Sequence, residues 1–155
     1  MLSLLLALLA AQAVPPQEDP VDPYPQSNAN AGARSFEGAA MLEAFHGRAG
    51  IDRIVDDLVA RNVIDPRISD IFKAQDLIRL RRTLKEQFCY ILNGGCAYTG
   101  RDMKSSHKDL GLQQSDFNAL VDNLQRAMQH EKVSYRAQNR LLAKLAPMQR
   151  DTVVR

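Results

Sequence analysis

Three widely separated histidines are the first side chains of this sequence to consider as metal ligands or catalytic groups. His46 lies at the front of the helical region and His130 stands beside Glu131 at a predicted helix end, and both are settings for a solvated or capping histidine. His107 sits instead on a short predicted helix behind a glycine-rich turn, with long apolar stripes on both sides. Spacing alone leaves His107 two interpretations: a ligand, or a side chain half-buried against the core.

Two cysteines, Cys89 and Cys96, stand seven residues apart. In an exported chain an even count favours a disulfide, and this one would join a helix end to the loop after it. Two buried free thiols are the alternative. Together with scattered histidines, the pair does not supply the four closely spaced ligands of a structural zinc site. A Cys-x-x-Cys-His motif for covalent haem attachment is missing, as are the glycine and serine motifs of nucleotide-binding and hydrolase folds.

The charge pattern argues against a polyanionic partner. The formal net charge is only +2, and the basic run Arg79 to Arg82 alternates with apolar residues at helical spacing. Such a run is typical of a solvated helix face, so no nucleic-acid partner is predicted.

The apolar periodicity predicts helices throughout the second part of the chain. One helix covers 51–59 before Asp65-Pro66, and a long one runs over 77–91 up to Asn93-Gly94-Gly95. A short helix is expected over 103–108. Ser115 and Ser134 are the predicted N-caps of the last two helices. We therefore predict one all-α domain over residues 38–155.

Two segments precede this domain. Residues 1–13 form an apolar run that ends in a small-x-small pattern, Ala11-Gln12-Ala13, and is too short to span a bilayer. This favours a cleaved signal peptide, with a retained anchor or a start codon placed too late as alternatives. Cleavage predicts a periplasmic or secreted protein without a membrane attachment. Residues 14–37 are rich in Pro, Asn, Ser and Gly and are expected to form a flexible linker.

The run from Tyr98 to His107, YTGRDMKSSH, followed by Gly111-Leu112 and Asp116-Phe117, resembles the group I truncated haemoglobins. The resemblance covers most of residues 45–152. It implies a truncated globin fold, a two-over-two helical sandwich around haem b, with His107 as the single protein ligand of the iron. It also implies that O2, NO or CO binds there. The cysteine pair is similar to that of an exported-looking subgroup, which again favours the disulfide.

The same resemblance assigns the walls of the haem slot. Tyr98 matches a residue that packs near the turn before the histidine helix. Matches to the positions that wall the porphyrin are Phe88, Met103, Leu112, Phe117 and Val121.

On the opposite side the sequence departs from the family. Val59 stands where the family usually has a tyrosine that donates a hydrogen bond to oxygen, and Leu80 and Leu84 stand where Gln or His is frequent. Gln87 is the nearest polar candidate, and Lys85 or Arg81 could reach in if the register shifts by one residue. The predicted distal pocket is therefore unusually apolar.

These features predict a globin that reversibly binds oxygen or another diatomic gas. Whether it is also an enzyme stays open, although simple binding is favoured, because an exported NO dioxygenase would need a redox partner. A haemless binding or sensory module on the globin scaffold is the main alternative. An electron-transfer haem with Lys85 as a second axial ligand is a third.

Overall fold

The computed structural model describes residues 15–153. The predicted signal peptide at 1–13 lies outside the described residues. Among the helices that are described, none is both long and apolar enough to cross a membrane.

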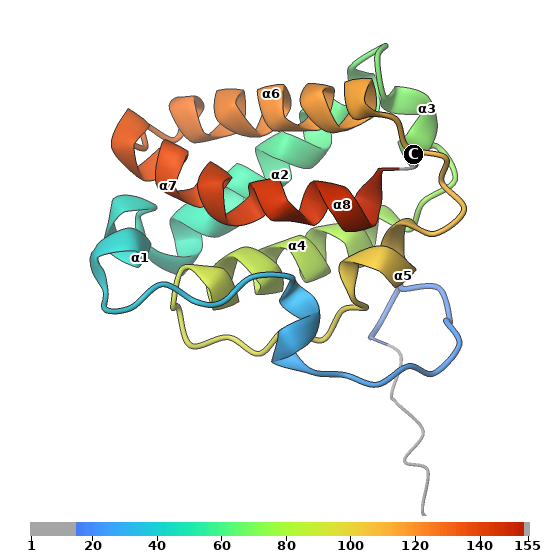
Figure 1. Ribbon diagram of the computed structural model, residues 1–155, viewed down its shortest axis with the longest axis horizontal. Coiled ribbons are helices and arrows are strands. Elements are labelled where there is room, and N and C mark those ends of the chain that lie inside the picture. The colour runs from blue at the N-terminus through green and yellow to red at the C-terminus, as the bar shows by residue number, and fades with distance from the viewer. Residues whose placement is uncertain (1–14, 154–155) are drawn as a thin grey trace, which may run out of the picture.

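The described chain is helical, as predicted (Figure 1). In Figure 1, α2 and α4 run antiparallel to each other, and α6 runs antiparallel to the α7–α8 arm. α2 contacts both α4 and α6, so it lies at the centre of the packing. In chain order the elements are η1 (Asn28–Ala31), α1 (Ala40–Ala44), α2 (Gly47–Ile64), α3 (Ser69–Phe72), α4 (Leu77–Ile91), α5 (Met103–His107), α6 (Gln114–His130), α7 (Tyr135–Leu145), η2 (Ala146–Met148) and α8 (Gln149–Thr152).

The core forms where the apolar stripes of these helices meet. Because residues three and four apart share one face of a helix, each stripe turns a continuous apolar surface inward. Burying those side chains is the main favourable term in folding. The buried core includes Ile51, Ile54, Val55 and Leu58 of α2, Phe88 and Ile91 of α4, Leu124 and Met128 of α6, and Leu141 of α7.

Polar side chains set the starts of several helices. Ser134 accepts a hydrogen bond from the backbone of Ala137, which confirms its predicted role as the N-cap of α7. The prediction that Ser115 caps α6 is wrong, because α6 begins at Gln114 and Ser115 lies inside it. Its N-cap is Gln113, whose backbone N–H donates to the Asp116 carboxylate at 2.8 Å in a capping box.

Residues 15–37 differ from the expected flexible linker, because they lie along the domain rather than away from it. We call this segment the strap; in Figure 1 it runs in blue beneath α4 and α5. Glu18 is buried and binds Arg82 of α4. Farther along, Ala31 is fully buried and its carbonyl accepts a 2.8 Å hydrogen bond from the Gln87 amide.

The strap is held by polar contacts and a few small side chains, which composition does not reveal. Tyr24 donates from its hydroxyl to the Thr99 carbonyl at 2.6 Å, and Asn28 accepts from the Tyr98 backbone N–H at 2.8 Å. Low apolar content alone predicted disorder, but each of these bonds stabilises the strap against the domain.

Candidate functional site: a histidine helix and an apolar cavity

His107 is the last residue of α5, a helix of five residues. The short helix starts at Asp102, whose carboxylate accepts from the Ser105 backbone N–H at 2.9 Å and from the Ser105 hydroxyl at 2.7 Å. These bonds hold the pKa of the Asp102 carboxyl below its usual range. An isolated helix this short is unstable in water, so the cap and the packing of α5 against α8 carry its conformation.

The imidazole of His107 is oriented by its own helix. Its Nδ1 lies 2.7 Å from the carbonyl oxygen of Met103. A carbonyl oxygen can only accept, so Nδ1 carries a proton, and in the neutral imidazole Nε2 keeps its lone pair. Metal-bound histidines are commonly held in this way, with one nitrogen bonded to a backbone carbonyl and the other left to the metal. The half-buried His107 side chain is therefore in the tautomer that a ligand needs.

The turn before α5 is built around Tyr98. Its buried hydroxyl donates to the Arg101 carbonyl at 2.9 Å, which closes the turn, and burial raises the pKa of the phenol. Gly100 lies directly under the Tyr98 ring, where any added Cβ would collide with the ring and its hydroxyl. Glycine is therefore required at this position, and the compact turn delivers the chain to Asp102 at the start of α5.

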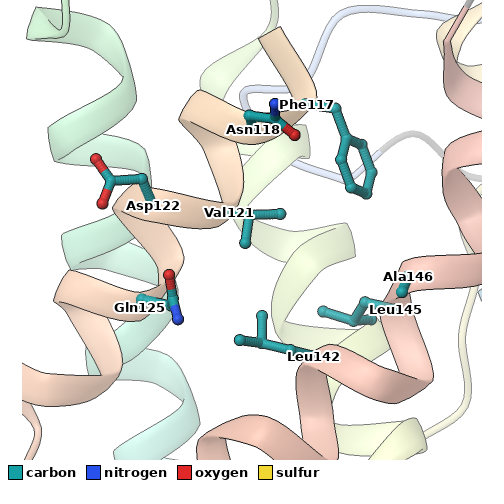
Figure 2. Close-up of a pocket in the computed structure, with 8 residues that line it drawn as sticks. All are labelled: Phe117, Asn118, Val121, Asp122, Gln125, Leu142, Leu145 and Ala146. Atoms are coloured by element: carbon teal, nitrogen blue, oxygen red, sulfur yellow. The ribbon is translucent and has the colours of Figure 1, made fainter. Parts of the chain in front are cut away.

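Between α6 and α7 the molecule has a cavity of about 330 Å³. Figure 2 shows apolar side chains from the two helices facing one another across it. Asp122, which also lines it, is held at the surface by Arg67 and Arg126. The full lining is Phe117, Asn118, Val121, Asp122, Gln125, Leu142, Leu145 and Ala146.

The predicted wall residues fall into three groups. Phe117 and Val121 line the cavity. His107 and Leu112 are half-buried outside its lining, as are Leu80 and Leu84 on α4. The remaining four are part of the buried core: Val59, Phe88, Tyr98 and Met103.

On the α2 and α4 side the predicted polar candidates point elsewhere. Gln87 is buried, but its amide donates to Ala31 of the strap. Lys85 and Arg81 both turn to Asp56 of α2, with nitrogen–oxygen distances of 3.0 and 3.6 Å. Val59 is completely buried. The polar groups that sequence analysis offered as donors are therefore engaged in other contacts.

The other two histidines form surface ion pairs. His46 and His130 are exposed and pair with carboxylates of Glu131 and Asp57, each at 3.1 Å. Within residues 15–153, no group of three or more His, Cys, Asp or Glu side chains could hold a metal ion. A metal at His107 would therefore have to bring its other ligands with it, as haem iron does.

The disulfide predicted between Cys89 and Cys96 is confirmed, and it joins the last turn of α4 to the following loop.

Sequence analysis missed the contribution of α7 to the cavity. Leu142 and Leu145 belong to the apolar stripe of that helix, and helical spacing does not distinguish a cavity wall from core packing. Leu142 is adjacent to the deeply buried Leu141 and Leu145 lies one turn after it, and both are only half-buried.

Comparison with known proteins supports the resemblance found in the sequence. The family described as "Bacterial-like globin" matches residues 40–153. The group 1 truncated haemoglobin of Nostoc sp. (strain MUN 8820) is 31% identical over 96 residues, which are 62% of this chain and 81% of that protein. That of Mycolicibacterium paratuberculosis is 25% identical over 115 residues, 74% of this chain and 85% of its own.

Solved structures agree in fold. The truncated haemoglobin of Tetrahymena pyriformis in its Fe(III) form superposes with a TM-score of 0.71 at 21% identity, covering 74% of this chain and 98% of that one. The 2/2 haemoglobin of Synechococcus sp., in the cyanomet state with covalently attached haem, gives a TM-score of 0.69 at 24% identity over the same shares. The helical arrangement is thus that of the 2/2 globins.

Proposed function

The chain belongs to the group 1 truncated haemoglobins of the bacterial-like globin family, and from this premise we propose that it binds haem b through His107 and reversibly binds a diatomic gas. The observation that carries the proposal is the bond from His107 Nδ1 to the Met103 carbonyl, which leaves Nε2 available. When bound, the haem iron would supply the centre at which O2, NO or CO binds.

The chain's own residues fit this cofactor in two respects. A flat apolar group needs apolar walls, and Phe117, Val121, Leu142 and Leu145 offer them between α6 and α7. Haem iron needs one protein nitrogen, and the capped α5 helix presents one. A hydrogen-bond donor near the iron would stabilise a polar bound gas, but the Val59 side chain has no donor. Simple reversible binding is therefore favoured over gas activation.

The visible spectrum of the purified protein with added haem tests this function. We expect a Soret band in the wild type that His107→Ala loses or shifts, because the axial ligand is removed. His130→Ala is the matched control, since it removes an exposed imidazole paired with Asp57 and should leave the spectrum unchanged. Circular dichroism checks that each variant is folded. If the folded wild type takes up no haem, the haemless binding module becomes the better description.

Export is a separate part of the proposal, carried by residues 1–13. The mass of the protein recovered from outside the cytoplasm is expected to correspond to a chain that begins at Val14. Recovery of the full-length chain from the cytoplasm alone would contradict export.

A further inference from the structure

The Cys89–Cys96 disulfide lies against the guanidinium group of Arg48. Arg48, in the first turn of α2, places Nη2 2.6 Å and Nε 3.2 Å from the Cys96 sulfur. Its Nε also lies 3.4 Å from the Cys89 sulfur. Within the described part of the chain Arg48 forms no ion pair, so its charge is directed at the two sulfur atoms.

The neighbouring cations on α4 differ in this respect. Arg82 is bound by Glu18 of the strap and by Glu86, and Lys85 is bound by Asp56. Their charges are therefore largely compensated within the protein. Arg48 is the group that can still respond to a negative charge that develops on sulfur.

The disulfide is also accessible from one side. Cys89 is 4% exposed, but Cys96 is only half-buried in the loop after α4. Both cysteines line a second cavity, of about 610 Å³, between α2 and α4. Among the cations that line it, Arg81, Arg82 and Lys85 each pair with a carboxylate, whereas the charge of Arg48 beside the sulfur atoms remains to attract an anion.

We propose that Cys89–Cys96 is a reducible disulfide that exchanges with a small thiol carrying carboxylate groups, which enters through this cavity. The thiolate attacks the accessible Cys96 sulfur, forming a mixed disulfide and breaking the Cys96–Cys89 bond. The electron pair of that bond leaves on Cys89 as a thiolate. A second thiol attacks the mixed disulfide and leaves as part of the oxidised dimer, so two electrons pass to the protein as two cysteine thiols.

Arg48 favours this exchange for two reasons. A cation beside a cysteine lowers the pKa of its thiol, and a leaving thiol of lower pKa departs faster. The same charge stabilises the reduced protein relative to the disulfide, which makes the bridge easier to reduce. Reduction then frees the loop that leads to Tyr98 from the end of α4. The proposal does not depend on haem binding.

The test compares reduction of the purified, oxidised protein by reduced glutathione, which is anionic, and by cysteamine, which is cationic. Arg48→Gln is expected to slow reduction by glutathione about five- to tenfold and to lower the ratio of the glutathione rate to the cysteamine rate. Arg150→Gln is the matched control, because it removes the same charge from α8 and should leave both rates unchanged. A wild-type bridge that survives about 10 mM glutathione for hours, or equal rates in wild type and Arg48→Gln, would overturn the proposal.

A second measurement follows the thiols directly. In the fully reduced protein, the alkylation rate of Cys96 with iodoacetamide is measured across pH. We expect the midpoint of this profile to lie about one pH unit lower in the wild type than in Arg48→Gln, because Arg48 stabilises the thiolate. Equal midpoints would show that Arg48 does not act on the sulfur, and the proposed role would fail.

Discussion

The His107 side and the Val59 side of the proposed haem slot are organised by different forces. Directional hydrogen bonds hold the first: Asp102 caps α5, Tyr98 closes the preceding turn, and Met103 orients the imidazole. Apolar packing holds the second, where Val59 is fully buried and the nearby polar groups are engaged elsewhere.

One side of the slot positions the iron ligand, and the other side sets how strongly a bound gas is held. A ligand that coordinates through one nitrogen needs a fixed tautomer and direction, and hydrogen bonds supply both. An apolar face excludes water but gives no polar partner to a bound gas, so it lets the gas leave. Each of the following predictions changes one side and leaves the other as it is.

The largest effect is expected from adding a donor to the apolar side. In the haem-loaded protein, Val59→Tyr should slow oxygen release about 10- to 100-fold, which corresponds to one hydrogen bond to a strongly polarised acceptor. Stopped-flow measurement of the oxygen dissociation rate checks this. Val59→Phe adds a similar volume without the hydroxyl, so an equal slowing in both variants would show that size and not polarity is responsible.

A smaller effect concerns the strap that braces the His107 side. Hydrogen bonding from Arg82 holds the pKa of Glu18 below its usual range, even though burial opposes this. The ionised carboxylate therefore adds stability above the ordinary pKa of 4.5, and this is lost as pH falls through the lower folded value. Glu18→Gln should lower the free energy of unfolding at neutral pH by about 1–2 kcal/mol.

The pH dependence is what distinguishes this contribution from simple packing. Urea unfolding of wild type and Glu18→Gln should give a difference that shrinks steadily below about pH 4.5. A difference that stays constant down to the acid limit would mean that the ionised Glu18–Arg82 pair does not stabilise the strap.

Removing the helix cap on the His107 side should cost less. Asp102→Ala is expected to destabilise the protein by about 1 kcal/mol and to speed haem loss, since the helix that presents His107 loses its first bonds. Lys104→Ala, an exposed change in the same helix, is the control for helix propensity. If both variants lose haem at the wild-type rate, the cap does not position the ligand.

The smallest effect is expected at Lys85. Because its ammonium lies 3.0 Å from Asp56 on α2, it should not bind iron, and Lys85→Ala should leave the ferric haem spectrum unchanged. A low-spin wild-type spectrum that this variant converts to high-spin would instead support an electron-transfer haem with Lys85 as second ligand.

Much of the architecture could be predicted from local patterns. The stripe over 77–91 and the glycines after it are enough to place α4 and its end, and Ser134 is enough to start α7. Ser115 was a misleading cap, because the reciprocal bonds of Gln113 and Asp116 place the N-cap two residues earlier, at Gln113. Several cap residues in a row compete, and sequence alone does not rank them.

By itself the sequence determined most of the helices and the resemblance around His107 and favoured the disulfide, since each depends on residues close together in the chain. Only the tertiary structure decided the path of the strap, the engagement of Gln87 and Lys85, and the place of Arg48 beside the sulfurs. These contacts join residues far apart in sequence, such as Gln87 with Ala31 and Arg48 with Cys96. Polar side chains on a helix can point to several partners, and the packing of neighbouring elements decides which one they meet.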